Sequence, residues 1–581
     1  MIVGIDLGTT NSLVSAWTDE GITLIPNEFG EYLTPSVVSF DGKEAIVGKT
    51  AKERLITHPD KTASEFKRQM GKGVKYNLGL GLSFSPVELS AIVLRKLIAD
   101  AEKYLGEKVD SAVISVPAYF DDHQREATRL AGIKAGVKVS QLVNEPSAAA
   151  LSYHYDNMDQ DEKFIVFDFG GGTLDVTLVE AFDNMVEICN ISGDNALGGK
   201  DFNEIIALDI CKSHGIDWDK LDNKNKAVLI NCGENVKIRL SDSDTTKTIV
   251  NAAGDEFEYE LDQQRFIDIS ASVFRRLTIV LKRLMNDASL STDDIDGVIM
   301  VGGSSKMPSV RAYMESLFPG KIMVDPQGDV AICRGAGIVT GINLRKESVK
   351  DIVMTDICPF SLGIEVIGDK MAVIIPKNQI LPYSKQNKFF TVNNMQKKIE
   401  FNVYQGEKLK ASSNLKLDTI VLDVPPKPKG EVFANVRFSY DLNGIYDIDI
   451  YCPANGAEIH RSRGAQEGID KDELMNIKLR MDELKQDPRE IPEIKYLLEK
   501  SQRLYEEGNQ VQRQFLEEEI TSFNELLDRA SIIDCKKAAA IFSIRLDRLE
   551  KSMFSFDNEA EDLWKQYIEE NMENKDPQDE T

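Results

Sequence analysis

The spacing of apolar residues divides the chain into three regions. From residue 1 to about 350, short apolar runs typical of β-strands alternate with stretches of helical spacing, which indicates α/β layering. Between about 357 and 464 the spacing changes to period 2, which predicts strands with one buried face. From about 465 onward glycine and proline become rare and apolar residues recur at helical spacing, so we expect a helical tail. Residues 569–581 are acidic, and we expect them to be disordered.

Single elements can be predicted in the first two regions. Ser85 and Glu88 form a capping box at the start of a helix, and Gly106 ends that helix. In the second region, Asn443-Gly444 suits a tight hairpin between two strands. The residues predicted to face inward on two of these strands are Ile399, Phe401 and Val403, and Val436, Phe438 and Tyr440.

A short apolar segment bracketed by acids separates the first two regions. It reads Asp351-Ile352-Val353-Met354-Thr355-Asp356 and follows a charged stretch at 345–350. Its local pattern fits an edge strand as well as it fits a linker.

Length and composition indicate a globular protein of two to four domains. The chain has 581 residues, of which 42% are hydrophobic and 28% charged. The net charge of −26 argues against a nucleic-acid surface and against attraction to an anionic membrane. The first residues enter a strand without the features of a secretory signal, and no apolar stretch reaches the roughly 20 residues that span a bilayer. The seven cysteines are scattered and never form C-x-x-C, so we expect free thiols in a reducing cytoplasm.

Two turns of nearly the same sequence carry the candidate chemistry. Asp6-Leu7-Gly8-Thr9-Thr10 and Asp168-Phe169-Gly170-Gly171-Gly172-Thr173 each lie between apolar runs of strand type. Glycine lets the backbone approach phosphate oxygens, successive N–H groups point at an anion, and the threonine hydroxyl adds a donor. The aspartate ahead of each turn can hold Mg²⁺ through metal-bound waters, because magnesium gives up water reluctantly. One copy alone is most often a simple strand-to-strand turn, whereas two copies predict a site that holds one triphosphate from both sides.

Three motifs carry a resemblance to a known family. They are Ile5-Asp6-Leu7-Gly8-Thr9-Thr10-Asn11-Ser12, Val166-Phe167-Asp168-Phe169-Gly170-Gly171-Gly172-Thr173-Leu174-Asp175 and Val301-Gly302-Gly303-Ser304-Ser305-Lys306-Met307-Pro308. With the linker, the β region and the helical tail, they make the chain resemble the 70-kDa heat-shock proteins, the DnaK-type chaperones, over nearly its whole length. Residues 356–363 and the short tail are most similar to the HscC branch.

The resemblance implies a multidomain fold. An actin-like α/β ATPase domain of two lobes would be followed by an all-β sandwich that binds substrate and by a short α-helical lid. The expected boundaries are 1–350 for the nucleotide-binding (ATPase) domain, 351–356 for the interdomain linker, 357–464 for the β-sandwich peptide-binding domain and 465–581 for the helical lid with its acidic disordered tail.

The resemblance also assigns a nucleotide site. ATP or ADP would bind between the lobes with Mg²⁺, and K⁺ is left open as a further cation. Asp6 and Asp168 would hold the Mg²⁺ shell through water, and Lys67 would be the catalytic lysine that stabilises charge at the γ-phosphoryl group. Glu145 and Asp175 would place or polarise the attacking water. The residues expected to contact the nucleotide are Gly8, Thr9, Thr10, Asn11, Gly170, Gly171, Gly172, Thr173, Gly198, Gly199, Glu234, Lys237, Ser241, Gly302, Gly303, Ser304 and Lys306.

Without the family, some of these residues would be interpreted differently. Lys67 would be a solvated surface charge, and Glu145 would be an acid at a helix start. Glu234, Lys237 and Ser241 share one face of a predicted helix, and an i,i+3 salt bridge would explain the first two.

The family pattern further predicts coupling between two sites. Residues 351–356 resemble the linker, although Val353 and Met354 stand where the family usually has leucines. Pro117 and Arg125 match the proline switch and its relay arginine, so the expected allosteric residues are Pro117, Arg125, Asp351 and Asp356. Ile364, Phe389, Ile399 and Phe401 would line a peptide cleft, with Ile367 and Val392 forming an arch over it. An ordinary sandwich core remains the alternative for some of these side chains.

The chain departs from the family pattern at three places. Lys306 replaces an arginine that usually stacks on adenine, and lysine lacks the planar face for stacking. Gln327-Gly328-Asp329 replaces a more acidic sequence. The helical tail is also shorter than usual, which suggests the hypothesis of a shorter client residence.

The favoured function is an ATP-dependent molecular chaperone, in which ATP binding and hydrolysis gate the binding and release of short extended hydrophobic segments of unfolded polypeptides. A J-domain co-chaperone would accelerate hydrolysis, a nucleotide exchange factor would release ADP, and we expect a cytoplasmic monomer. An actin-like ATPase of another kind, either a small-molecule kinase or a filament former, would not explain the linker, the β region and the helical tail. A nucleotide-gated scaffold without hydrolysis is a third hypothesis, against which Lys67, Asp168 and Asp175 argue. Transfer of phosphate from ATP to Thr173 is a further, less favoured one.

Overall fold

The computed structural model describes most of the chain. The described ranges are 1–41, 44–79, 81–157, 161–182, 184–252, 255–323, 328–441, 444, 446–463, 488–529 and 532–554. The expected hairpin position Asn443, the start of the predicted helical tail at 465–487 and the acidic end at 569–581 lie outside these ranges.

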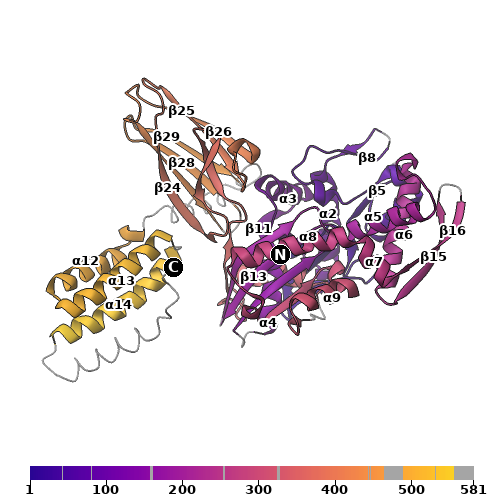
Figure 1. Ribbon diagram of the computed structural model, residues 1–581, viewed down its shortest axis with the longest axis horizontal. Helices are drawn as coiled ribbons and strands as arrows, with labels where there is room; N and C mark the ends of the chain where they lie inside the picture. The colour runs from indigo at the N-terminus through magenta and orange to yellow at the C-terminus, as the bar shows by residue number, and fades with distance from the viewer. Residues whose placement is uncertain are drawn as a thin grey trace.

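Two sheets form two lobes (Figure 1), and five strands of each sheet follow one another in the same arrangement. The order in lobe I is β11-β10-β1-β2-β3, and in lobe II it is β18-β17-β12-β13-β14-β19. The strands of lobe I are β1 (Ile2–Asp6), β2 (Asn11–Thr18), β3 (Gly21–Ile25), β10 (Ser111–Val116) and β11 (Lys138–Asn144), with β4 (Thr34–Pro35) paired to β2. The strands of lobe II are β12 (Glu162–Phe169), β13 (Leu174–Phe182), β14 (Met185–Asp194), β17 (Gly297–Val301), β18 (Ile322–Met323) and β19 (Val353–Met354).

The strand directions repeat as well as the strand order. In each lobe the strand that leads into the glycine turn is antiparallel to the strand that leaves it, and parallel to its other neighbour. Asp6 faces Leu13 in the first hairpin, and Asp168 faces Asp175 in the second. The two sequence turns therefore join equivalent strands of two like-built sheets, as the duplicated pattern predicts.

Helices fill the space between the sheets and cover their outer faces. Helices α4 (Glu145–Asp156) and α10 (Ala331–Asn343) lie between the lobes, where Val113 of β10 and Phe164 of β12 share one core with them. Lobe I is covered by α2 (Pro86–Leu105) and α3 (Asp122–Ala135). Lobe II is covered by α5 (Gly199–Ser213), α6 (Asn223–Leu240), α7 (Gln263–Ile269), α8 (Ala271–Asp287) and α9 (Pro308–Leu317).

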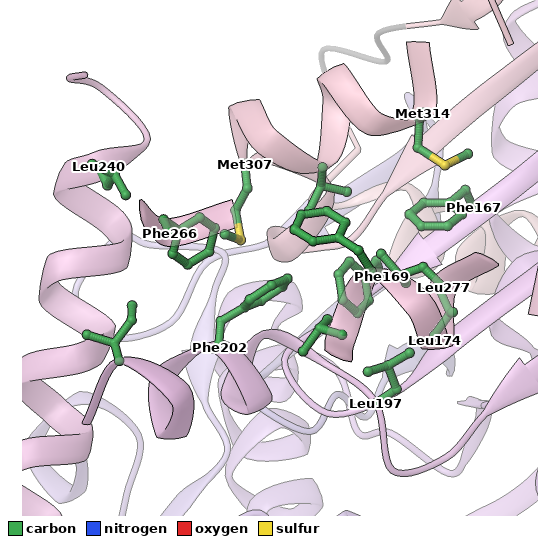
Figure 2. Packing of buried hydrophobic residues seen from close by; sticks show 14 of the residues in the cluster. Phe167, Phe169, Leu174, Leu197, Phe202, Leu240, Phe266, Leu277, Met307 and Met314 are labelled. Atoms are coloured by element: carbon green, nitrogen blue, oxygen red, sulfur yellow. The ribbon is translucent and has the colours of Figure 1, made fainter. Parts of the chain in front are cut away.

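The core of lobe II is rich in aromatic rings (Figure 2). Phe169 of β12 packs edge-on against Phe167 and against Phe202 of α5, at 5.9 and 6.1 Å between ring centroids. Such edge-to-face pairs stabilise a core beyond the area that they bury. Because Phe169 belongs to the second glycine turn, this packing fixes the turn to the core.

The predicted capping signals of α2 are confirmed. The Ser85 hydroxyl accepts a hydrogen bond from the Glu88 N–H, the Glu88 carboxylate accepts one from the Ser85 N–H, and Gly106 follows the last turn with φ of 70°. The remaining short elements of the first 350 residues are α1 (Lys49–Thr57), β5 (Val37–Phe40), β6 (Ala45–Val47), β7 (Thr62–Ser64), β8 (Tyr76–Asn77), β9 (Ser83–Phe84), β15 (Thr245–Ala252) and β16 (Asp255–Asp262).

Two four-stranded antiparallel sheets follow and pack on one core, as the period-2 pattern predicts. All six residues that were predicted to face inward are buried: Ile399, Phe401, Val403, Val436, Phe438 and Tyr440. The first sheet contains β22 (Lys370–Ile375), β21 (Leu362–Val366), β25 (Lys398–Gln405) and β26 (Leu415–Asp423). The second contains β24 (Tyr383–Phe390), β27 (Phe433–Tyr440), β28 (Tyr446–Cys452) and β29 (Ala457–Arg463), and a short pair joins β20 (Asp356–Ile357) to β23 (Ile380–Leu381).

Three helices form a separate bundle near the end of the chain (Figure 1). They are α12 (Pro492–Glu507), α13 (Gln510–Arg529) and α14 (Ile532–Phe554). Leu504, Leu516 and Leu546 are among the residues of their shared core. None of the described helices is long and apolar enough to cross a membrane.

Candidate nucleotide-binding site

Two connected cavities lie where the glycine turns of the two lobes meet. The larger one, of about 600 Å³, extends toward α6, and the smaller one, of about 290 Å³, reaches the aspartates that end β1 and β12. Thr9, Thr10, Asn11, Gly171 and Gly303 line both cavities. Together they have the size of a small-molecule site.

The two turns approach each other so closely that glycine is required. A Cβ atom on Gly171 would lie 2.1 Å from the Thr10 hydroxyl oxygen of the other lobe, and a Cβ on Gly8 would lie 2.0 Å from the Asn11 carbonyl oxygen. Both turns also hold their own shape through backbone and hydroxyl bonds, since Gly170 N–H donates to the Thr173 carbonyl and the Ser36 hydroxyl donates to the Gly8 carbonyl. The two turns therefore face each other, as the sequence predicts.

A buried ion pair lies beneath the turns. The Lys67 ammonium, on a single 3₁₀ turn (Phe66–Gln69), contacts the Glu145 carboxylate at the start of α4, and their side chains are only 4% and 7% exposed. Asp6 accepts a hydrogen bond of 2.7 Å from the Ser115 hydroxyl. The interpretation of Lys67 as a solvated surface charge is therefore wrong.

Burial shifts the acids of this cluster strongly. Burial, reinforced by the charge of Glu145, raises the pKa of Asp6 to about 6 and the pKa of Asp175 to about 7. The pKa of Asp168 is raised well above its usual range by burial and by the charges of Glu145, Asp175 and Asp6. Four carboxyl groups with one ammonium leave an excess of negative charge that a bound cation would stabilise.

The residues present fit a nucleotide with Mg²⁺. The Thr10 Oγ1 and Asp175 Oδ2 atoms are buried and have no hydrogen-bond partner among the described residues, so both are free to bind a ligand or its water. Among the residues that the structure describes, no group of three His, Cys, Asp or Glu side chains is arranged to hold a metal ion. Asp6 and Asp168 both line the smaller cavity and are the residues that would hold Mg²⁺ through water.

The nucleoside end is formed by α6. Glu234 and Lys237 line the larger cavity, while the Ser241 hydroxyl bonds to the Lys237 carbonyl at 3.2 Å and is not part of the lining. The Lys237 ammonium donates to the Gly199 carbonyl at 3.0 Å, and burial lowers its pKa to about 8. Glu234 lies 3.8 Å from Lys52 of lobe I. The alternative of an i,i+3 salt bridge between Glu234 and Lys237 is therefore not realised.

Most of the predicted nucleotide contacts line the two cavities. Those that do not are Gly172, Gly198 and Ser241, and the predicted catalytic residue Asp175 also lies outside the lining. Gly198 instead packs against Gly172, where a Cβ atom would lie 2.4 Å from the Gly172 nitrogen. Lys306 lies at the rim of the smaller cavity, where its ammonium pairs with Asp329.

Charged residues that the sequence analysis missed bridge the two lobes at the cavity mouth. Arg68 donates to the Gly172 carbonyl at 2.8 Å and lies 3.4 Å from Asp201, and Lys200 pairs with Glu65. Lys200 and Asp201 directly follow Gly198-Gly199 at the start of α5, which was the available signal.

A polar network joins lobe I to Asp356, the last residue of the predicted linker. Arg125, which is buried, donates to the Ala118 and Phe120 carbonyls and, at 2.5 Å, to the Asn144 side-chain oxygen. The Asn144 amide donates in turn to the Asp356 carboxylate at 2.7 Å, and the Ser147 hydroxyl donates to the same oxygen at 3.3 Å. Burial raises the pKa of Asp356.

The linker itself is a strand at the edge of lobe II. Val353 and Met354 pair in parallel with Met185 and Val186 of β14. Val353 N–H donates to the Asn184 carbonyl at 2.8 Å, and Thr355 N–H donates to Val186 at 3.0 Å. The edge-strand interpretation of this segment is confirmed, and its role as a linker stays a prediction. Of its two bracketing acids, Asp351 is exposed and only Asp356 is buried.

The β-sandwich contacts the two lobes directly. Lys377, in the turn before β23, pairs with Asp287 of α8 at 3.1 Å. Phe360 packs edge-on against Tyr119 at 4.7 Å, close to the predicted switch residue Pro117, which is buried. The Asp122 N–H donates to the buried side chain of Gln405 at 3.0 Å. Residues after the linker therefore touch both lobes.

The predicted peptide-cleft residues fall into two groups. Ile364, Ile399 and Phe401 are buried in the sandwich core, and the half-buried Phe389 packs edge-on against Phe401 at 6.1 Å. Ile367 and Val392, which were expected to form an arch, are 72% and 39% exposed.

Two like-built lobes that bring glycine turns and acids together around a cavity define a two-lobed nucleotide-binding protein. A protein-family model described as Hsp70 protein matches residues 2–78 and 72–573 of the chain. Because the match extends over nearly the whole sequence, the chain belongs to the Hsp70 family. Members of this family are chaperones and ATPases that use nucleotide and Mg²⁺.

Proposed function

We propose that this protein is an ATP-dependent molecular chaperone, in which ATP binding and hydrolysis control the binding and release of extended hydrophobic segments of unfolded polypeptides. The observation that carries the proposal is continuity: the carboxylate and lysine cluster, the docked linker and the β-sandwich form one connected structure. Membership of the Hsp70 family supports the same function.

Within the proposed site, Asp6 and Asp168 would hold Mg²⁺ through its water, and the ion would neutralise phosphate charge when bound. Lys67, held in place by Glu145, lies where it can stabilise charge on the γ-phosphoryl group. Glu145 and Asp175 accept hydrogen bonds from the attacking water and orient it. Excluding bulk water strengthens each of these interactions, because charges interact more strongly in a medium of low polarity.

At the nucleoside end, Glu234 and Lys237 would hold the ribose, and Gly303 and Ser304 would approach from the other side of the larger cavity. Lys306 is tied to Asp329 and so offers a charged pair in place of a stacking face. We therefore expect weaker base stacking than in relatives with arginine at this position.

Coupling runs through the linker in this proposal. Arg125, Asn144 and Asp356 form a continuous hydrogen-bonded path from lobe I to the first strand of the β-sandwich. Pro117 precedes the turn whose Tyr119 contacts both Phe360 and the Asp175 carboxylate. A change at the γ-phosphate can thus alter contacts that hold the sandwich against the lobes.

The β-sandwich is the proposed client site. An extended segment would gain main-chain hydrogen bonds and bury one or two apolar side chains near Phe389 and Phe401, under the exposed Ile367 and Val392. One Leu-sized side chain contributes about 1.5 to 3 kcal/mol, so each contact is modest and many sequences can bind.

The remaining assignments complete the proposal. The division into an ATPase domain at 1–350, a linker at 351–356, a sandwich at 357–464 and a helical lid at 465–581 is part of it. We also propose that the chain belongs to the HscC branch of the family. Its proposed partners are a J-domain co-chaperone that accelerates hydrolysis and an exchange factor that releases ADP.

A single-turnover ATPase assay tests the proposed function. Purified protein loaded with one equivalent of Mg·ATP is followed with and without an apolar heptapeptide. We expect slow basal hydrolysis that the peptide accelerates. Absence of ATP binding by calorimetry, or hydrolysis that the peptide leaves unchanged, would contradict the proposal.

A further inference from the structure

Helix α8, which lies on lobe II (Figure 1), carries an exposed basic strip. Arg275, Ile279 and Lys282 are solvent-exposed and follow one another at spacings of four and three, which places them on one face, and Arg283 borders that face. Ile279 is 53% exposed. Arg275, Lys282 and Arg283 take part in no ion pair within the described part of the chain, whereas the neighbouring, half-buried Arg276 pairs with Asp194 and Asp201.

This strip is unusual in so acidic a protein. With a net charge of −26, three unpaired cations beside an exposed isoleucine form a local region of opposite sign. Such a surface attracts an acidic segment that also carries apolar side chains.

An apolar cavity of about 470 Å³ adjoins the strip at the start of α8. Its walls include Ile267 of α7, Ala271 and Phe274 of α8, and Ala312 and Tyr313 of α9. Ala271 lies one turn before Arg275 on the same face, so cavity and strip are continuous. The Phe274 and Tyr313 rings, 5.3 Å apart, form an aromatic wall.

The cavity has one charged acceptor, the Asp268 carboxylate. The Gln264 amide donates to one of its oxygens at 3.1 Å. A carboxylate accepts several hydrogen bonds, so Asp268 can accept another. Ser309 is the other small polar residue of the lining, and the rest of the wall is apolar or aromatic. A largely apolar cavity with the Asp268 carboxylate as its charged acceptor fits an indole ring, which is apolar except for a single N–H donor.

The chain itself contains a segment of this chemistry. Residues 555–581 follow α14 and carry ten Asp or Glu residues against two Lys, together with the aromatic residues Phe556, Trp564 and Tyr567. Trp564 lies between the acidic pairs Glu561-Asp562 and Glu569-Glu570. Trp564 is the tenth residue after α14, and ten extended residues span about 33 to 36 Å from the end of that helix.

We propose that residues 555–581 dock on lobe II, with Trp564 in the cavity between α7, α8 and α9 and the flanking acids on Arg275, Lys282 and Arg283. The docked segment ties the end of the helical bundle to the ATPase lobe. Because the contacts beside the tryptophan are ionic and exposed, salt weakens them. The inference does not depend on hydrolysis or on client binding.

Fluorescence of the full-length protein tests this docking. The chain has three tryptophans, and the difference between the wild type and Trp564→Phe isolates the emission of Trp564 from that of Trp17 and Trp218. We expect Trp564 to emit at a blue-shifted wavelength and to be protected from acrylamide. In the triple variant Arg275→Glu, Lys282→Glu, Arg283→Glu, and in high salt, we expect both signs of burial to disappear.

A charge-matched control is Lys103→Glu, Lys134→Glu, Lys212→Glu, which alters three exposed cations on other helices. It should leave Trp564 buried, and circular dichroism should show that both triple variants are folded. If acrylamide quenches Trp564 of the wild type as strongly as a solvent-exposed tryptophan, the proposal is overturned. It is also overturned by a Trp564 that stays protected in the α8 variant but is exposed by Ile541→Ser and Ile544→Ser, since the segment then packs on the exposed face of α14 instead.

Discussion

Lys67 is buried among four acids at the meeting point of the lobes, and this position gives it a testable role. Replacing it with methionine keeps the side-chain length but removes the charge beside Glu145. We expect single-turnover hydrolysis to fall by about 10² to 10³-fold, as when one charge-stabilising group is removed from an active site. ATP should still bind, because the turns and Glu234 remain.

Quenched-flow measurement of hydrolysis, with calorimetry for binding, checks the Lys67→Met variant. Lys49→Met is a suitable control, since Lys49 forms an exposed pair with Glu31 in the same lobe. Wild-type hydrolysis by Lys67→Met would rule out the proposed role.

The raised acid pKa values predict a dependence on pH. The pKa of Asp6 is about 6 and that of Asp175 about 7, against about 4 in the unfolded chain. As the pH rises from about 4 to 7, the unfolded chain loses these protons first, so these acids lower the free energy of unfolding over that range. Above about pH 7 the free energy of unfolding stays lowered by these ionised acids until a cation binds beside them.

Mg·ATP binding should reverse this cost, because a cation favours the ionised acids. We expect the affinity for Mg·ATP to increase from about pH 5.5 to about pH 7.5, with proton release on binding near the lower value. Calorimetry in two buffers of different ionisation enthalpy measures both quantities. An affinity that is constant over this range, with no proton release, would contradict the assigned burial of Asp6 and Asp175.

At the residue scale, the turns were predictable and their surroundings were not. Gly8 and Gly171 are set by local backbone chemistry that the sequence displays directly. Asn144 was missed because its position at the start of α4 is that of an ordinary helix cap, yet its side chain makes no capping bond and instead joins Arg125 to Asp356. Contacts between residues 212 positions apart have no local signal.

At the scale of elements, the linker strand β19 offers the clearest test. Val353→Pro removes the N–H that donates to Asn184 and should release the strand from β14. Losing one such bond costs about 1 kcal/mol, so we expect the detached population to increase by about fivefold. Limited proteolysis at residues 350–356 reports this change.

Val353→Ala is the matched control, because it shortens a half-exposed side chain but keeps the N–H. It should be cleaved at the wild-type rate. Equal protection of Val353→Pro and wild type would mean that the strand pairing contributes nothing to docking.

The elements also differ in how far the sequence determined them. Helix α2 has its complete cap signal within four residues, and the sandwich strands show their buried faces by alternation. The segment at 351–356 was ambiguous because an edge strand with two paired residues is shorter than any periodicity can define. Its partner, β14, lies far away in the sequence, and only the folded lobe supplies it.

At the scale of the whole molecule, Asp356 should couple the lobes to the sandwich. Asp356→Asn preserves the shape but removes the charge that accepts from Asn144 and Ser147. We expect peptide to stimulate hydrolysis less in this variant, with basal hydrolysis retained. Asp19→Asn, at an exposed position of lobe I outside the predicted sites, should respond to peptide like the wild type. Equal peptide stimulation of Asp356→Asn and wild type would place the coupling elsewhere.

The most direct measurement of the central claim is the dissociation rate of a fluorescein-labelled apolar peptide from the intact protein in a stopped-flow instrument. Complexes formed with Mg·ADP are mixed with excess unlabelled peptide and either Mg·ATP or Mg·ADP. The proposed coupling from the lobe cavity through Asp356 to the sandwich predicts much faster release with Mg·ATP. Identical release rates with the two nucleotides would contradict it.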